Sequence, residues 1–153
     1  MITENLDHYL AVKNTIREEA NAFPFGFAFS DEQFNDMMEK WGLDPADTDK
    51  ILRVFSGSFI RKSDREAYIN MIRRHDKLLE DAIAEDTTGE GFIYEALLYE
   101  LQNHEYLYSY DKETVLEAVG LSLKDLEENK AVSNGFKLAE RAYFKMCDDN
   151  DWW

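Results

Sequence analysis

The sequence predicts an α+β fold in which helices dominate and a small antiparallel sheet of three strands, including a β-hairpin, completes the structure. Apolar residues recur at helical spacing along most of the chain. Two short apolar runs flank Ser56 and Gly57, which is typical of a hairpin turn. The chain has 153 residues, of which 44% are hydrophobic, so it holds enough apolar surface for a packed core. No low-complexity linker divides it, and we expect residues 1–153 to form a single domain with an acidic, aromatic tail at 148–153.

The first segment, Ile2–Phe23, has apolar residues at helical spacing and predicts a helix. Phenylalanine then occupies every second position from 23 to 29, a period that gives a strand one aromatic face. Pro24 places the beginning of this strand at a sheet edge or in a loop. Two further strands, Ile51–Phe55 and Ser58–Lys62, read as a hairpin that completes the sheet.

Capping sequences mark where the remaining helices begin. A capping box pairs an N-cap Ser with a polar side chain three residues later, and each satisfies a free amide of the other. Such boxes begin at Ser30, Ser63 and Ser122. A helix is predicted over Ser30–Trp41, which Gly42 ends, and a turn of helix over Pro45–Lys50. Longer helices are predicted over Ser63–Asp86 and Phe92–Tyr106. The remaining predicted helices are Lys112–Val119, between a cap at Asp111 and a stop at Gly120, a short helix from Ser122, and Val132–Cys147.

The charge distribution is strongly polarised. The chain has 17 Lys and Arg against 32 Asp and Glu, a formal net charge of −15. Direct binding to nucleic acid or to an anionic membrane requires clustered positive charge, so this balance argues against both. Residues 78–111 hold nine acids and no Lys or Arg, whereas residues 61–77 hold six bases against three acids. The two segments could pair within one chain or across a dimer, and the sequence leaves the oligomeric state open.

The acidic stretch 78–111 also holds five of the eight tyrosines, and acids and tyrosines alternate along it. Tyrosine offers a large contact area with a polar tip, and carboxylates attract basic partners. One hypothesis is a partner-binding surface, and the alternative is a solvated helix whose tyrosines pack inward. The tail with Trp152 and Trp153 is a second docking element, unless it folds back onto the core. The candidate partner-binding residues are Glu90, Tyr94, Glu95, Tyr99, Glu100, Glu105, Tyr106, Tyr108, Tyr110 and Asp111.

Two segments carry weak signals for a metal. Residues 86–93 begin like an EF-hand calcium loop, but Leu97 stands where the bidentate Glu belongs, and a helix–Gly–helix connection with its own caps is the alternative. Glu100 and His104 are four residues apart and share a helix face, as metal ligands or a proton-transfer pair would. Two ligands are too few, although His8 or His75 could complete the site; the alternative is a Glu–His pair without metal. We expect no cofactor.

No enzyme motif stands out in the chain. Cys147 is the sole cysteine, so it forms no internal disulfide, and its acidic neighbourhood raises a thiol pKa and weakens the nucleophile. Met1–Asn5 does not resemble a signal peptide, and no apolar run is long enough to span a membrane. We expect a cytoplasmic binding protein, and the alternative is an enzyme.

Four phrases together resemble a family of small uncharacterised bacterial proteins that are frequent on phages and other mobile elements. The resemblance covers roughly residues 27–130, and the tip of the hairpin, Phe55–Ser58, holds fewer glycines than we expect of that family. It carries over no activity and no catalytic residue. The phrases are Asp47–Lys50, Gly57–Lys62, Thr88–Ile93 and Tyr99–Tyr106.

Because small acidic proteins of mobile elements often block host defence nucleases, the resemblance implies an anti-CRISPR or anti-restriction inhibitor that acts by nucleic-acid mimicry on a basic, nucleic-acid-binding host protein. Two other hypotheses stay open: a metal-dependent enzyme or metal sensor built on Glu100 and His104, and a plain interaction module.

Overall fold

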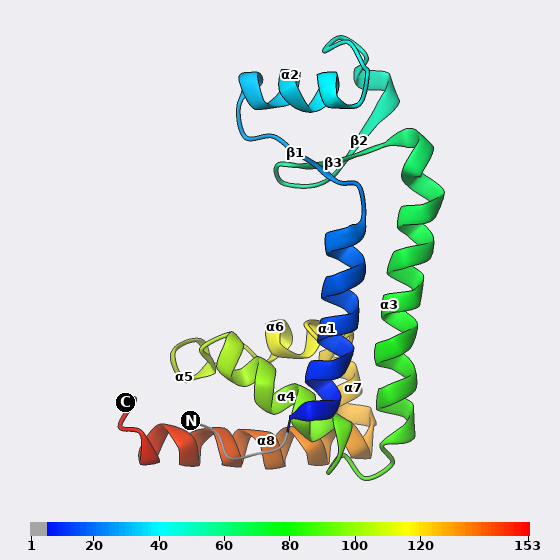
Figure 1. Cartoon of the computed structure of the whole chain (residues 1–153). Helices are drawn as coiled ribbons and strands as arrows, with labels where there is room; N and C mark the ends of the chain where they lie inside the picture. The colour runs from blue at the N-terminus through cyan, green and yellow to red at the C-terminus, as the bar shows by residue number, and fades with distance from the viewer. Residues whose placement is uncertain (1–5) are drawn as a thin grey trace. The chain divides into compact units, whose positions relative to one another are not determined.

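The computed structural model describes residues 6–153 and confirms the helix-dominated α+β fold (Figure 1). These residues form two compact units: a helical unit, made of the chain up to Thr15 together with His75–Trp153, and a sheet unit, Ile16–Arg74. The α-helices are α1 Asp7–Ala22, α2 Asp31–Lys40, α3 Arg65–Glu85, α4 Phe92–Asn103, α5 Tyr106–Ser109, α6 Lys112–Glu117, α7 Leu123–Glu128 and α8 Lys130–Asp149. The expectation of a single domain stays a prediction.

The sheet unit contains the predicted three-stranded antiparallel sheet, in the order β1-β3-β2. Its strands are β1 Gly26–Phe27, β2 Ile51–Phe55 and β3 Ser58–Arg61. The hairpin between β2 and β3 lies where the sequence predicts it. Gly57 turns the hairpin with a φ of 72°, a conformation that glycine adopts without steric cost.

The strand predicted from the alternating phenylalanines is much shorter than expected, because only Gly26 and Phe27 pair with β3. Before them, the N–H of Phe25 donates to the carbonyl of Phe23 at 2.8 Å, which is a tight turn and not extended chain. The rings of Phe23 and Phe25 pack against Tyr68 of α3, with centroids 5.9 and 6.0 Å away. Aromatic packing against a helix therefore replaces strand pairing over this segment.

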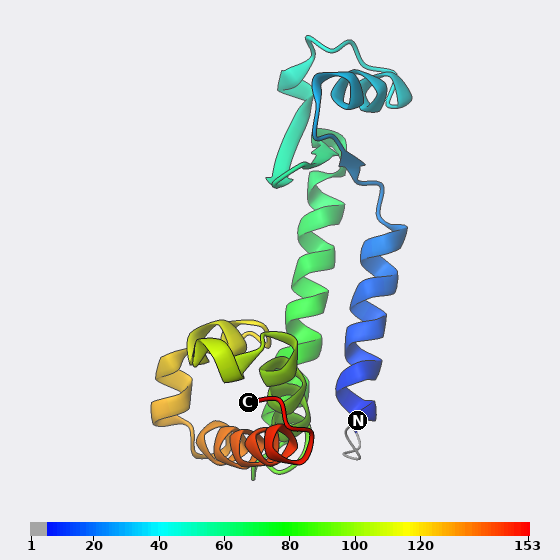
Figure 2. The same ribbon diagram turned by 90° about the vertical axis from the view of Figure 1, so that its left-hand side faces the viewer.

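Helix α2 covers one face of the sheet, as Figures 1 and 2 both show. Met37 and Met38 of α2 form a small core with Ile51 and Phe59 of the hairpin. The side chain of Ser30 accepts the N–H of Gln33, as predicted. The return bond differs from the prediction, since the Gln33 side chain accepts the N–H of Phe29 instead of that of Ser30.

The main core of the helical unit lies between α4 and α8. Helix α4 buries seven of its residues, and α8 contributes Val132, Phe136, Ala139 and Tyr143. Met146 is half-buried and packs against this core. No helix among residues 6–153 is both long and apolar enough to cross a membrane.

Several helix boundaries differ from the prediction. Helix α4 ends at Asn103, because Glu105 adopts a left-handed φ of 48° and breaks the helix before Tyr106. A short 3-10 helix over Lys62–Asp64 precedes α3, and no side-chain cap is present there. The turn expected over Pro45–Lys50 is helical only at Thr48–Lys50.

The caps in the C-terminal half follow the prediction. Asp111 accepts the N–H of Thr114 at the start of α6, and Ser122 and Asp125 form a reciprocal capping box on α7. Helix α8 is longer than predicted, because Asn129 caps it and the helix begins at Lys130, two residues before Val132. The first helix begins at Asp7 in the structure, and the part of its prediction before residue 6 lies outside the described residues.

Candidate interaction surface

The loop that resembles the beginning of an EF-hand is closed by its own aspartate. One carboxylate oxygen of Asp86 accepts the N–H of Gly89 at 2.9 Å. The other accepts the N–H groups of Gly91 and Ile93 at 3.1 and 3.0 Å, at the start of α4. The aspartate therefore satisfies free amides of the loop and of the helix N-terminus, as in the alternative of a helix–Gly–helix connection.

Glu100 lies at the centre of a buried hydrogen-bond network, with only 1% of the residue exposed. Its Oε1 accepts the hydroxyl of Tyr9 at 2.6 Å and the ammonium of Lys13 at 2.9 Å. Its Oε2 lies 3.2 Å from the amide nitrogen of Asn103 and 3.2 Å from Nε2 of His104. The network joins the first half of α1 to α4.

Electrostatics keep this carboxylate ionised. Burial by itself raises the pKa of Glu100, but the hydrogen bonds from Tyr9, Lys13 and Asn103 outweigh it, so the pKa lies below its ordinary value. The pKa of Tyr9 is raised, first by burial and then by its bond to the carboxylate. The Lys13 ammonium also lies 4.8 Å from the ring centroid of Tyr99.

The predicted Glu100–His104 pair is thus present, but as part of an ion-pair network. Lys13 already supplies the cation that a metal would supply. His8 does not complete a site, since its Nδ1 lies 3.6 Å from Glu95. Among residues 6–153, no three His, Cys, Asp or Glu side chains are grouped so that they could hold a metal ion. His75 is buried, with 7% of the residue exposed.

Cys147 is also buried, and it lies in the core of the helical unit. Burial, with a further contribution from the charge of Asp148, raises the pKa of its thiol. The sequence predicted correctly that acidic neighbours raise the pKa of this thiol, but burial raises it more than the charge of Asp148 does.

The ten candidate partner-binding residues separate by burial. Glu90, Glu105, Tyr108, Tyr110 and Asp111 are exposed, Tyr94, Glu95 and Tyr99 are half-buried, and Glu100 and Tyr106 are buried. The hydroxyl of Tyr106 donates to Glu140 at 2.8 Å. Burial raises the pKa of this tyrosine. Both readings of the stretch are therefore partly realised, with some tyrosines packed inward and others facing solvent.

The structure joins the exposed tyrosines to the C-terminal tail. The hydroxyl of Tyr108 donates to the carbonyl of Trp152 at 3.3 Å. The ring of Phe144 links the two segments, since its centroid lies 6.1 Å from Tyr110 and 5.8 Å from Trp153, stacked on the latter at 10°. We call this set the end surface: Glu105, Tyr108, Tyr110, Phe144, Asp151, Trp152 and Trp153.

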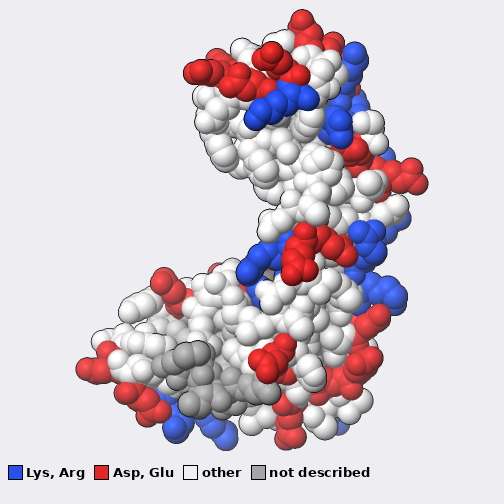
Figure 3. Space-filling view, viewed as in Figure 1, with Lys and Arg blue, Asp and Glu red and all other residues white. Residues whose placement is uncertain are grey.

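The end surface combines exposed aromatic rings with acidic side chains. Tyr108 is 74% exposed and Trp153 is 63% exposed. Within the described part of the chain, the carboxylates of Glu105 and Asp151 form no hydrogen bond or ion pair. Figure 3 shows acidic side chains around an uncharged area at the end of the helical unit that carries α5 and the C-terminus.

Backbone strain is concentrated at the same place. In the described residues, three positions other than glycine have positive φ: Glu105 at 48°, Tyr110 at 52° and Asp151 at 54°. A side chain in this region costs roughly 1–2 kcal/mol, and such residues are often found at functional sites. Sequence reasoning named the tyrosines and the tail separately, but it missed Phe144, which looks like an ordinary apolar residue of a helix.

The fold and this surface define a class: a helix-dominated α+β protein with an acidic, aromatic patch and a buried ion-pair network. More particularly, the chain belongs to DUF7659, a family of unknown function whose model matches residues 8–142. No curated protein and no solved structure gives a significant match to the chain.

Proposed function

We propose that this protein is a non-enzymatic binding protein whose end surface captures a basic segment of another protein. The observation that carries the proposal is the convergence of three strained residues, Glu105, Tyr110 and Asp151, on the exposed aromatic surface. Strain of this kind persists only where the surrounding structure enforces it.

Arginine and lysine side chains suit this surface chemically. A guanidinium group stacks on an exposed aromatic face such as that of Trp153 or Tyr108. The carboxylates of Glu105 and Asp151, which form no ion pair within residues 6–153, then supply the opposite charge at the edge of the contact. The core of the contact is aromatic and its rim is acidic, which is the arrangement of a typical protein interface.

We propose that the partner is a host defence protein that binds nucleic acid, and that this chain is an anti-CRISPR or anti-restriction inhibitor of phage or mobile-element origin acting in the cytoplasm. A net charge of −15 complements a groove built to hold phosphates. It equally disfavours direct binding of nucleic acid by this chain.

The structure changes which residues carry the proposal. Glu100 and Tyr106 are buried and serve the core, whereas Trp152, Trp153 and Asp151 join the surface. The metal-site alternative receives no support from the geometry, because the Lys13 ammonium lies 2.9 Å from Glu100. We therefore propose the end surface as the binding site.

The test is a pull-down from nuclease-treated host lysate with the tagged full chain, at low and at high salt. Exposed charges are screened over ~8 Å at physiological ionic strength, so we expect high salt to release the partner. A Tyr108→Ala, Glu105→Gln, Asp151→Asn variant should weaken capture at least tenfold. The control changes one exposed apolar and two exposed acidic residues elsewhere: Leu123→Ala, Glu127→Gln and Glu128→Gln.

Equal capture by both variants would show that the end surface is not the binding site. A complex that is insensitive to salt would contradict electrostatic recognition. Capture of a basic nucleic-acid-binding protein that depends on salt and on Tyr108, Glu105 and Asp151 would support the proposal and name the partner.

A further inference from the structure

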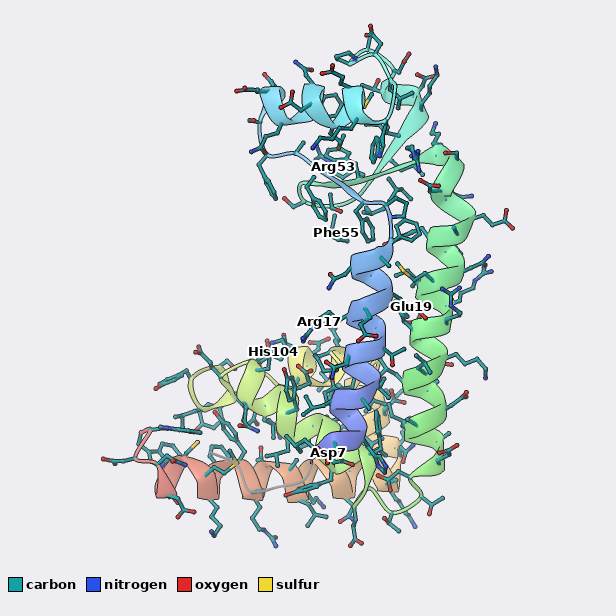
Figure 4. All side chains as sticks on the ribbon, viewed as in Figure 1. Asp7, Arg17, Glu19, Arg53, Phe55 and His104 are labelled. Carbon is teal, nitrogen blue, oxygen red and sulfur yellow. The ribbon has the colours of Figure 1, made fainter. Side chains whose placement is uncertain are left out.

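The chain makes a defined turn at the C-terminal end of α8. Beyond the helix it leaves the helix axis, as Figure 4 shows. The N–H of Trp152 donates to the carbonyl of Cys147 at 3.0 Å. The N–H of Asp151 donates to the carbonyl of Asp148 at 3.3 Å, and Asp151 has a left-handed φ of 54°. These two bonds form a Schellman motif, which fixes the path of the chain after α8.

The turn brings Trp153 back onto α8, where two side chains hold its indole ring. Phe144 covers one face of the ring, with the centroids 5.8 Å apart and the ring planes 10° from parallel. The indole N–H donates to Oδ1 of Asp148. Phe144 and Asp148 are four residues apart on α8, so they lie on the same face of the helix. The orientation of the indole ring is therefore fixed before a partner binds.

The second face of this indole ring is open. Trp153 is 63% exposed, although Phe144 covers one of its faces. Among residues 6–153, no other aromatic ring packs against it, and no Lys or Arg of the chain lies over it. Trp153 therefore presents one flat, open face to a partner.

Negative charge lies at the edge of the ring. The exposed carboxylate of Asp148 accepts the indole N–H and forms no ion pair within residues 6–153. Its charge polarises the indole and makes the ring face more attractive to a cation. Lys145 of the same helix is held by Asp149 at 3.1 Å. The open face of Trp153 therefore suits a cation that another molecule supplies.

We propose that the end surface selects arginine over lysine, and that Trp153 makes this selection. The inference rests on the proposed function, because it names the side chain by which the basic partner is recognised. A guanidinium group is planar and weakly hydrated, so it stacks on a single ring that is open to water. An ammonium group is compact and strongly hydrated, so it gains most where it is desolvated by its surroundings.

The aromatic residues of the end surface form no enclosure around Trp153. Tyr108 contacts the tail through its hydroxyl, which donates to the carbonyl of Trp152 at 3.3 Å. The ring of Tyr110 packs against Phe144, with the centroids 6.1 Å apart. Neither tyrosine ring packs against Trp153. Methylated lysines are recognised in cages of several rings, so this single open face favours a planar cation over them as well.

The test compares three peptides of equal charge. The first is an acetylated, amidated Gly–Ser peptide that contains three arginines, and the other two contain lysines or trimethyl-lysines at the same positions. The general attraction to a chain of net charge −15 is then the same for all three and cancels from the comparison. Proton–nitrogen correlation spectra of the full chain follow each titration through the indole N–H signals of its three tryptophans.

We expect the arginine peptide to bind at least threefold more tightly than the other two. A cation over an exposed ring is worth about two- to fivefold in affinity. The arginine peptide should shift the indole signal of Trp153 and leave that of Trp41, in the sheet unit, in place.

A variant at the ring tests which residue makes the selection. In Trp153→Leu, the preference for arginine should fall below about 1.5-fold, because the leucine side chain has no aromatic face. Phe29→Leu removes an aromatic ring of the sheet unit that belongs to a 76% exposed residue, so it is the matched control and should keep the full preference. Circular dichroism of both variants shows whether the fold is intact.

The outcomes separate this inference from the proposed function. Equal binding of the arginine and lysine peptides at the end surface would overturn the inference and leave the proposed function standing. Tighter binding of the trimethyl-lysine peptide, or a preference for arginine that persists in Trp153→Leu, would also overturn it. If none of the three peptides shifted the signal of Trp153, the end surface would bind no basic segment, and both proposals would be wrong.

Discussion

At the scale of single residues, Glu100 is the side chain on which most other groups depend. It is buried, yet four donors surround it, and they come from α1, from α4 and from the end of α4. Removing one partner from such a network leaves a buried polar group unsatisfied, which costs more than the bond itself contributes. A role in stability therefore explains this residue better than a role in metal binding.

The first prediction at this scale concerns Glu100→Gln. The folded pKa of Glu100 is lowered, so the ionised side chain stabilises the fold above the unfolded pKa, and this contribution is lost as pH falls through the folded pKa. We expect the variant to lose about 1–3 kcal/mol of unfolding free energy at pH 7. Urea denaturation should show this loss shrinking from about pH 5 to about pH 3.

Glu105→Gln is the control for this prediction, because Glu105 is exposed and forms no side-chain bond within residues 6–153. Its unfolding free energy should stay close to that of the unchanged protein. A loss in Glu100→Gln that is constant over the whole pH range would mean that the carboxylate is not the stabilising species.

At the scale of elements, the closest packing occurs where α8 crosses the loop before α4. A Cβ atom added at Gly135 would lie 2.6 Å from Cγ2 of Ile93 and 2.8 Å from the carbonyl oxygen of Gly89. One added at Gly89, where φ is 85°, would lie 2.0 Å from the carbonyl oxygen of Ala131. The two glycines let backbone contact backbone at the main core.

We predict that Gly135→Ala destabilises the protein, although alanine favours helices. The added methyl group must displace Ile93 or the loop backbone, and overpacking of this kind costs about 1–3 kcal/mol. Chemical denaturation measures the change. Lys137→Ala, at an exposed position of the same helix, should stay within about 0.5 kcal/mol of the unchanged protein. A stabilised Gly135→Ala variant would show that the contact relaxes freely.

The element scale also shows where sequence reasoning succeeds. The hairpin and the caps at Asp111 and Ser122 were predicted because their signals are local: a turn, or a side chain three residues from its amide. The lengths of β1 and α4 were not predicted, because a tight turn at Phe23–Phe25 delays the start of β1, and α4 ends where Glu105 adopts a left-handed conformation.

At the scale of the whole molecule, the dominant quantity is charge. Several of the ion pairs within residues 6–153 join exposed side chains, such as Lys77 with Asp81 and Lys145 with Asp149. Exposed pairs of this kind contribute little to stability. Self-repulsion among the acids therefore opposes folding at low salt.

We predict that sodium chloride stabilises the protein. Raising the ionic strength from about 10 mM to about 300 mM shortens the screening length and weakens repulsion among exposed carboxylates. The unfolding free energy at pH 7 should rise by about 1 kcal/mol, and urea denaturation at both salt concentrations measures it. A fall in stability with salt would mean that attractive ion pairs outweigh the repulsion.

The sequence by itself determined the fold class, the hairpin, most helices and the acidic character of the chain, because these follow from local spacing and from composition. Only the tertiary structure decided which of the acid and tyrosine residues face solvent. Residues 90–111 read as one surface in the sequence, but packing against α1 buries Glu100, packing against α8 buries Tyr106, and Phe144 joins the exposed tyrosines to the tail. Burial depends on contacts between residues far apart in the chain, and no local pattern contains that information.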